Sequence, residues 1–212
     1  MNHNNLILVG GGGHCKSVID VAEGAGWSII GILDVAKNVG EKVLGYTIIG
    51  TDEQIPEFVG KASFLVTVGQ IKDVGLRMML HEKIMSACGE LATVIASDAL
   101  VSKHSEIGKG TVILHKSVVN AGAKIGTGCI VNTLSNIEHD SIIGDYCHIS
   151  TGAMVNGGCY IGRATFIGSG VIVANNVSIT ERCIVAAGAV VCKNISVSGS
   201  YAGNPAIIYK RT

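Results

Sequence analysis

Two histidines in one short segment could carry out acid–base chemistry. The segment NTLSNIEHDSIIGDYCHIS spans residues 132–150 and contains His139 and His148, with Glu138 and Asp140 on either side of the first. The ordinary pKa of histidine lies near neutrality, and a neighbouring carboxylate can fix its tautomer and raise its basicity. His139 is therefore a candidate general base, with Asp140 as the first choice of orienting carboxylate and Glu138 as the second. The alternative is a polar corner in which these side chains are only solvated.

A six-residue period runs through and beyond this segment. Aliphatic residues recur at every sixth position from Ile95 to Val197, a small residue stands two positions before many of them, and Gly or Asn often stands three positions after. Such a pattern is typical of a hexapeptide-repeat parallel β-helix, in which the aliphatic side chain points inward and Gly or Asn accepts a left-handed corner. Three repeats make one coil, so residues 18 apart in the sequence are expected to stack.

This coil period places the two histidines. The expected stack neighbours of His139 are Ala121 and Gly157, whose small size predicts free space for a ligand beside the imidazole. His139 and His148 are half a coil apart, so they are expected on different sides of the β-helix. They could share one site only between subunits, and a closed three-fold ring is the natural symmetric arrangement. The spacing therefore points to a homotrimer if both histidines serve one site.

Residues 1–90 follow a different rule, because apolar strand-like runs alternate with amphipathic helical patterns. This alternation predicts a small Rossmann-like α/β domain with a parallel sheet. Its strands are expected at 6–9, 28–34 and 63–69, and its helices at 14–26 and 71–89. The left-handed parallel β-helix is expected over 91–200, followed by a C-terminal tail over 201–212.

The run LVGGGGHCKS predicts a strand, a glycine-rich turn and the start of a helix, an arrangement that suits a phosphate group. The dinucleotide pattern G-x-G-x-x-G is not met, because Cys15 and Lys16 stand where its third glycine would be. Asp34 ends the second expected strand, where an acidic residue commonly meets a ribose. The sequence therefore predicts binding of a nucleotide phosphate, and the alternative is a turn with a packing role only.

Composition excludes several other classes of function. Net charge is zero and 15% of residues are charged, without a basic stripe, which argues against nucleic acid as a partner. No apolar run is long enough to span a membrane and the N-terminus lacks the basic region of a signal peptide, so we expect a cytoplasmic protein. The seven cysteines are scattered, and neither they nor the histidines have metal-ligand spacing. His104 and His115 fall on outward positions without a setting like that of His139.

The chain resembles the bacterial NeuD/PglD-type sugar acetyltransferases over nearly its whole length. The features that carry the resemblance are the GGGGH opening, the hexapeptide repeats, the histidine segment and the terminal GNPA. The resemblance implies homotrimers with three sites between adjacent β-helices and acetyl-CoA in the groove between two of them. It implies that His139 deprotonates the acceptor amine or hydroxyl. We interpret the reaction as direct acetyl transfer without a metal, because no exposed nucleophile stands beside a base and no residues have metal-ligand spacing. Val35 stands where relatives often have a second acidic residue after the one matched by Asp34.

The same resemblance implies further residue roles. Cofactor contacts are implied for His148 of the neighbouring subunit, Gly157, Ser169, Ala187 and Gly188. Acceptor contacts are implied for Asn132 and, toward a uridine nucleotide, for Gly10, Gly12, Gly13, His14 and Asp34.

Three functions remain open at this point. The first is N-acetylation of a nucleotide-linked 4-amino-dideoxy sugar, with UDP as the expected nucleotide, in bacterial glycan biosynthesis. The second is O-acetylation of sialic acid or another glycan hydroxyl, and the third is a non-catalytic β-helix binding or assembly protein. The intact EHD and GGGGH motifs favour an enzyme, and we expect the first function.

Overall fold

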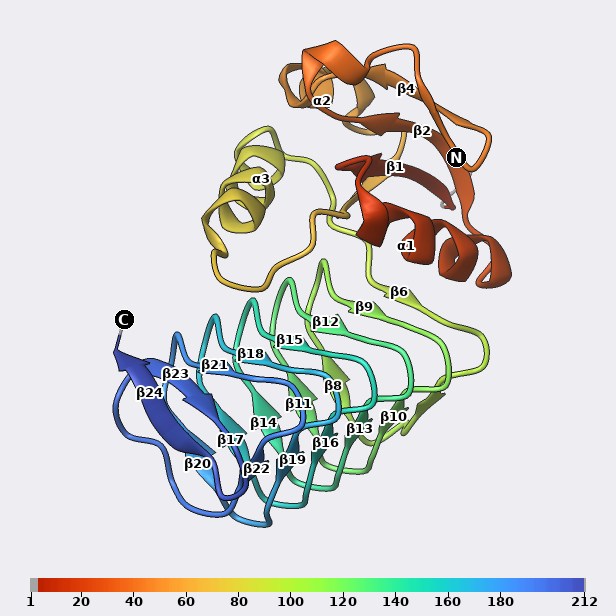
Figure 1. The fold of residues 1–212 in the computed structure, drawn as a ribbon. Helices are drawn as coiled ribbons and strands as arrows, with labels where there is room; N and C mark the ends of the chain where they lie inside the picture. Colours follow the sequence, from red (N-terminus) through yellow and green to blue (C-terminus); the bar gives the residue numbers. More distant parts are fainter. Residues whose placement is uncertain (1–3, 212) are drawn as a thin grey trace. The chain divides into compact units, whose positions relative to one another are not determined.

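The structure is a computed structural model that describes residues 4–211, and the chain divides into two compact units (Figure 1). The first ends at Ser97 and the second begins at Asp98. This division falls later than the boundary expected after residue 90. Strand β6 (Val94–Ile95) contacts helix α1 (Gly13–Gly24), which accounts for the inclusion of this segment in the first unit.

The first unit contains a five-stranded sheet in the order β3-β4-β2-β1-β5. Strand β1 pairs in parallel with β2 and β5, β4 pairs in parallel with β2, and β3 is the antiparallel edge strand. The expected parallel sheet is confirmed, whereas the β3–β4 hairpin was not foreseen. The strands are β1 (Asn5–Val9), β2 (Ser28–Leu33), β3 (Lys42–Val43), β4 (Tyr46–Gly50) and β5 (Ser63–Val66).

Both expected helices of this unit are present, together with the short α2 (Ile55–Phe58) and 3-10 turns at Ala36–Asn38 and Asp52–Gln54. Helix α1 buries Val18, Val21 and Ala22, as its apolar spacing predicts. Helix α3 (Gly75–Ser86) begins later than residue 71, because the chain that leaves β5 first forms a loop.

The second unit is a left-handed parallel β-helix built from two-residue strands, and the second residue of each is the expected inward aliphatic. Its coil strands are β7 (Leu100–Val101), β8 (Glu106–Ile107), β9 (Val112–Ile113), β10 (Val118–Val119), β11 (Lys124–Ile125), β12 (Ile130–Val131), β13 (Asn136–Ile137), β14 (Ile142–Ile143), β15 (His148–Ile149), β16 (Met154–Val155), β17 (Tyr160–Ile161), β18 (Phe166–Ile167), β19 (Ile172–Val173), β20 (Ser178–Ile179), β21 (Ile184–Val185) and β22 (Val190–Val191).

The strands stack into three sheets, which form the faces of the β-helix. The six-stranded face has the order β22-β19-β16-β13-β10-β7 and the five-stranded face the order β20-β17-β14-β11-β8. The eight-stranded face has the order β24-β23-β21-β18-β15-β12-β9-β6. Successive strands along the chain therefore lie on different faces, and each coil turns a corner between them.

In many repeats the small residue beside the corner is Ser, Thr or Cys, and there it also satisfies a backbone carbonyl. Its hydroxyl or thiol donates to the carbonyl 15 residues later, and the side chain itself is buried. Examples are Ser117 with Asn132, Ser141 with Asn156, and Cys147 with Gly162. Burial raises the pKa of Cys147 well above its usual range and also raises that of Cys159 and Cys183. These thiols therefore act as core residues and not as nucleophiles.

A left-handed corner recurs at every sixth residue, even where the sequence has neither glycine nor asparagine. Every sixth residue from Gly110 to Gly188 has a positive φ, whereas Asn194, for which the pattern predicts the same conformation, does not. A left-handed backbone costs other residues roughly 1–2 kcal/mol each, so the coil imposes these corners on the local sequence. The corner residues other than glycine are Lys116, Leu134, Asp140, Tyr146, Ala164, Asn176 and Arg182.

The repeat ends earlier than the sequence predicts. Val197, the last expected inward residue, is 48% exposed and lies outside the strands. Strand β23 (Gly199–Ala202) pairs with β21 so that Tyr201 lies beside Val185, and β24 (Ile207–Arg211) pairs with β23 in antiparallel fashion. Most of the expected C-terminal tail is therefore a hairpin that extends the eight-stranded face.

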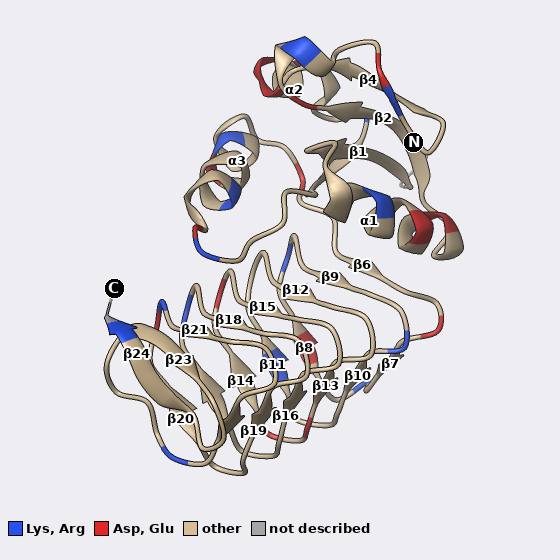
Figure 2. Ribbon diagram, in the orientation of Figure 1, with Lys and Arg blue, Asp and Glu red and all other residues tan. Residues whose placement is uncertain are grey.

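Charged residues of both signs are spread over the helices and over the corners of the coils (Figure 2). Within residues 4–211, no helix combines the length and the apolar character that crossing a membrane requires.

Candidate functional site

The EHD motif forms the corner between the six-stranded and five-stranded faces, directly after β13. Ile137 is fully buried in the β-helix, and the next residues turn outward until Asp140 adopts a φ of +59°. The side chains of His139 and Asp140 are 62% and 73% exposed. The corner therefore presents both groups to solvent on a rigid backbone.

The imidazole of His139 is held by the neighbouring carboxylate. His139 Nδ1 lies 2.9 Å from Asp140 Oδ2, the pairing preferred by the sequence analysis. A proton on Nδ1 donates to this carboxylate and leaves a lone pair on Nε2. The pair has the geometry of an oriented general base, with Nε2 as the basic atom.

Glu138 is occupied elsewhere. Its Oε1 accepts from Asn136 Nδ2 at 2.9 Å and its Oε2 accepts from Asn120 Nδ2 at 2.8 Å. These amides, Asn136 first and Asn120 second, lower the pKa of Glu138. The second-choice orienting carboxylate therefore lies in a polar network of its own, and Asp140 holds the ring.

Two glycines on neighbouring coils leave room for the side chains of His139 and Asp140. A Cβ on Gly157 would lie 2.6 Å from His139 Nε2, and a Cβ on Gly122 would lie 2.5 Å from Asp140 Oδ1. The stacking of Gly157 beside His139 is confirmed. The space that was expected to receive a ligand over Gly157 is taken by the imidazole itself, which covers this buried glycine.

His148 lies on another face of the β-helix, as expected from its half-coil separation from His139. It is 7% exposed on β15, and its ring meets Phe166 edge-on with a centroid distance of 5.1 Å. Asn132 Nδ2 lies 3.3 Å from His148 Nε2. Within one chain, Asn132 therefore accompanies His148 and not the His139 corner.

The other residues for which cofactor contacts are implied lie at the corners between the eight-stranded and six-stranded faces. Ser169 Oγ is 3.0 Å from Ser150 Oγ, and the N–H of Gly188 donates to the Ser169 carbonyl at 2.9 Å. Ser169, Ala187 and Gly188 are all exposed, and a Cβ on Gly188 would meet nothing within 4 Å. These corners leave backbone accessible along the β-helix axis.

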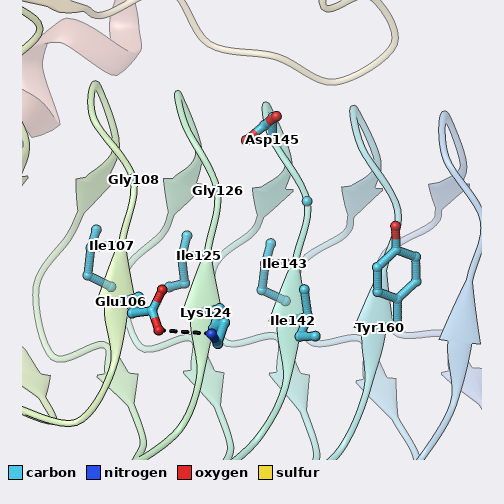
Figure 3. A pocket seen from close by; sticks show the side chains of 11 residues that line it. Glu106, Ile107, Gly108, Lys124, Ile125, Gly126, Ile142, Ile143, Asp145 and Tyr160 are labelled. Carbon is cyan, nitrogen blue, oxygen red and sulfur yellow. Dashed lines mark ion pairs between the residues drawn. The ribbon is translucent and has the colours of Figure 1, made fainter.

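An open depression of about 400 Å³ lies on the five-stranded face. The EHD corner leads into the middle strand of this face, β14. Figure 3 shows the Glu106–Lys124 ion pair, with an O–N distance of 2.9 Å, and further along the same face Ile142 and Tyr160. Ile142 and Tyr160 are 44% and 48% exposed. This surface was not foreseen from the sequence, because its residues occupy ordinary outward positions of the repeat.

The glycine-rich turn of the first unit joins β1 to α1. Gly10 has a φ of +112°, and a Cβ there would lie 2.6 Å from Val68 Cγ2, so this position requires glycine. A Cβ on Gly12 or Gly13 would meet nothing within 4 Å. These two glycines, at the start of α1, therefore leave the backbone N–H groups of the helix open to approach, as phosphate binding requires.

Asp34 lies beside this turn, as predicted. A Cβ on Gly11 would lie 2.8 Å from Asp34 Oδ2, and Gly10 N donates to the Leu33 carbonyl at 2.8 Å. Asp34 Oδ1 accepts from the N–H of Val35 and Oδ2 accepts from Asn38 Nδ2 at 2.9 Å. Asn38 was not foreseen, because it approaches Asp34 only through the 3-10 turn that follows β2.

A second histidine–carboxylate pair was also missed. His115 Nδ1 lies 2.7 Å from Asp98 Oδ1 at a different corner, so the statement that His115 lacks a comparable setting is wrong. The hydrogen bond from His115 lowers the pKa of Asp98. The two partners are 17 residues apart, and only the coil brings them together. Among the described residues, no group of three His, Cys, Asp or Glu side chains could hold a metal ion.

Comparisons with known proteins agree with these two units. Residues 5–83 match the family model described as the PglD N-terminal domain, and residues 158–193 match the model of the bacterial transferase hexapeptide (six repeats). None of the curated proteins matches the chain.

Solved structures match over nearly the whole chain. The acetyltransferase domain of PglB from Neisseria gonorrhoeae FA1090 is 30% identical with a TM-score of 0.88, covering 97% of this chain and 100% of that one. That domain has also been solved in complex with acetyl coenzyme A. A mutant of perosamine N-acetyltransferase from Caulobacter crescentus, in complex with CoA and GDP-perosamine, is 30% identical with a TM-score of 0.90, covering 96% of both chains.

The α/β unit, the β-helix and these full-length matches define a class of enzyme. The chain belongs to the NeuD/PglD-type sugar acetyltransferases. It is an acyltransferase of the hexapeptide-repeat superfamily.

Proposed function

We propose that the protein transfers the acetyl group of acetyl-CoA to the 4-amino group of a nucleotide-linked 4-amino-dideoxy sugar. The observation that carries this proposal is the His139–Asp140 pair, in which Nδ1 is held by the carboxylate and Nε2 is the basic atom. The similarity to a perosamine N-acetyltransferase crystallised with CoA and GDP-perosamine supports an amino-sugar acceptor. The similarity to PglB, whose domain was crystallised with acetyl coenzyme A, supports the donor.

His139 Nε2 takes a proton from the acceptor amine as its nitrogen attacks the thioester carbonyl carbon. The new C–N bond forms, and collapse of the tetrahedral oxyanion breaks the C–S bond. The proton held on Nε2 passes to the departing sulfur, so CoA leaves as the free thiol and His139 returns to its starting form. Asp140 keeps the imidazole in the correct tautomer and stabilises the imidazolium that forms. Direct transfer is consistent with the β-helix core thiols Cys147 and Cys183, which are buried and have raised pKa values.

The nucleotide of the acceptor binds at Gly10, Gly12, Gly13, His14 and Asp34 of the first unit, with UDP as our first choice of nucleotide. The open backbone at the start of α1 and the carboxylate beside the turn support this assignment. A relative that carries a GDP-linked sugar makes GDP the alternative to be tested directly.

The protein acts as a homotrimer in which His148 and Asn132 of one subunit complement the His139 corner of the next. Their location on another face of the β-helix supports this arrangement, because one chain cannot bring them to His139. Ser169, Ala187 and Gly188 contact acetyl-CoA, and the exposed corners at Ser169 and Gly188 support that role. Gly157, for which a cofactor contact was also expected, is covered by the His139 ring and leaves room for it instead. Light scattering of the purified protein should give three times the mass of one chain.

Release of CoA from acetyl-CoA tests the reaction, with UDP- and GDP-linked 4-amino sugars and CMP-linked sialic acid as acceptors. We expect turnover with one 4-amino nucleotide sugar and a loss of about 10²–10⁴-fold in His139→Ala. His115→Ala is the matched control, because it removes the imidazole of the other histidine–aspartate pair and should retain activity. Turnover with sialic acid alone would reassign the enzyme to O-acetylation, and an active His139→Ala variant would refute the base.

A further inference from the structure

The side chain of Arg77 is buried in the first unit, although arginine is rarely found fully buried unless paired. It is 1% exposed near the start of α3. His81, one turn later, is 0% exposed, and its Nδ1 lies 2.8 Å from the Arg77 carbonyl oxygen. A permanent charge is costly to bury unless it makes good hydrogen bonds. The groups to which the Arg77 guanidinium donates therefore indicate its structural role.

Arg77 holds the chain where it leaves the sheet. Its Nη1 donates to the carbonyl of Val66 at 2.8 Å and to the carbonyl of Val68 at 2.9 Å. Val66 is the last residue of β5, and we call the segment from Val66 to Gly69 the β5 exit. One nitrogen therefore fixes two carbonyls of this segment, with the strength of hydrogen bonds from a charged donor.

The β5 exit in turn supports the glycine-rich turn. Thr67 N donates to the Val9 carbonyl at 2.8 Å, and Thr67 Oγ1 donates to the Gly10 carbonyl at 2.5 Å. A Cβ on Gly10 would lie 2.6 Å from Val68 Cγ2, and a Cβ on Gly69 would lie 3.5 Å from His14 Cβ. The turn and the start of α1 are therefore packed against the segment that Arg77 holds.

We propose that Arg77 is a positioning residue for nucleotide binding. It holds the β5 exit, and the β5 exit keeps the turn from Gly10 to His14 in the conformation that receives the phosphates of a nucleoside diphosphate. The inference rests on the proposed function, because it requires the nucleotide at this turn. Arg77 makes its effect through other residues, and the residues proposed to contact CoA belong to the second unit. Its loss should therefore weaken nucleotide binding and leave CoA binding unchanged.

Three variants test this inference. Arg77→Met removes both hydrogen bonds, and Arg77→Lys keeps a charged nitrogen that can donate to both carbonyls. Thr67→Val, close in size to the native residue, breaks the next link by removing the bond to the Gly10 carbonyl. Calorimetry with UDP, GDP and CoA gives the dissociation constants. We expect nucleotide binding about tenfold weaker in Arg77→Met and Thr67→Val, largely restored in Arg77→Lys, with the CoA constant unchanged.

Hydrogen exchange over residues 9–15 gives a readout that does not depend on ligand. Faster exchange there in Arg77→Met and Thr67→Val, without faster exchange in the β-helix, is the expected result. Wild-type protein that binds CoA but neither UDP nor GDP would refute the nucleotide site, and this inference with it. Wild-type protein that binds nucleotide, with equal affinity and equal exchange in the variants, would overturn the role of Arg77 alone. If Arg77→Met does not fold, Thr67→Val decides by the same two measurements.

Discussion

Replacing Gly157 with alanine should disable the site while leaving the β-helix intact. The added Cβ would lie 2.6 Å from His139 Nε2 and 2.7 Å from His139 Cε1, and the backbone at Gly157 is not left-handed. The group that must move is a ring at the end of a side chain that is 62% exposed. Ordinary contact at about 3.5 Å requires the ring to shift by roughly 1 Å.

This shift moves Nε2, the atom proposed to act as the base. Asp140 holds Nδ1 at 2.9 Å, so the ring cannot move away from Gly157 without lengthening that hydrogen bond or turning Nε2. A displacement of about 1 Å in a reacting group can cost about 100-fold in rate. We expect kcat to fall about 100-fold. The free energy of unfolding should change by only about 0.5 kcal/mol or less, because the group that the new methyl displaces is the exposed His139 ring and not a core side chain.

Steady-state CoA release and thermal unfolding measure these two effects, and a double-mutant cycle identifies their cause. In a His139→Ala background the alanine at 157 meets no imidazole, so it should cause no further loss of activity. Full activity of Gly157→Ala would show that the ring position does not matter. An equal loss in both backgrounds would show that the glycine acts through its backbone or through packing instead of through His139.

Three further results are expected from the same geometry. Asp140→Gly should abolish most activity while leaving the melting temperature unchanged or slightly higher, because glycine suits the φ of +59° better than aspartate does. Asp140→Asn should also lose activity, although asparagine tolerates the corner. Normal turnover in either variant would exclude the carboxylate as the orienting group. Glu138→Gln should lower stability to denaturant at pH 7, because two asparagine amides depress the pKa of Glu138 and its stabilising effect exists only while it is ionised. The difference from wild type should shrink as the pH falls below the ordinary glutamate pKa of ~4.3 and then through the lower pKa of the folded state. A stability difference that does not depend on pH would contradict this. Cys88 and Cys192 are exposed and should react quickly with a thiol reagent in the native protein. Cys147 should react only after unfolding, because it is buried and burial raises the pKa of its thiol well above the usual range. Fast reaction of Cys147 in the native protein would show that reagent reaches the interior of the β-helix.

The six-residue period was sufficient to predict the β-helix. An aliphatic residue at every sixth position can be buried only if each repeat contributes one inward strand residue, so the period alone places Ile137 and Ile149 inside the coil. The period also predicted that Gly157 stacks beside His139. It failed at Val197, where the pattern continues in the sequence but the chain has already begun the turn into β23.

Contacts between coils were harder to predict from sequence. Asp98 meets His115 and Asn120 meets Glu138, and each pair joins residues about one coil apart. The spacing places such residues near each other but does not show which way their side chains turn. The buried Arg77 was missed because a charged residue within an amphipathic helix is ordinarily assigned to the exposed face.

The His139 corner shows how a uniform scaffold can carry one specific site. Every corner from Gly110 to Gly188 imposes the same left-handed backbone, which glycine or asparagine would accept most easily. At Asp140 this position holds a carboxylate, and the fixed backbone directs it to the imidazole one residue earlier. Glycines on neighbouring coils then leave room for both side chains. Aspartate at this position is less favourable for the backbone than glycine would be, but it supplies the carboxylate that orients the proposed base. The stability of the Asp140→Gly variant measures the first effect and its activity measures the second.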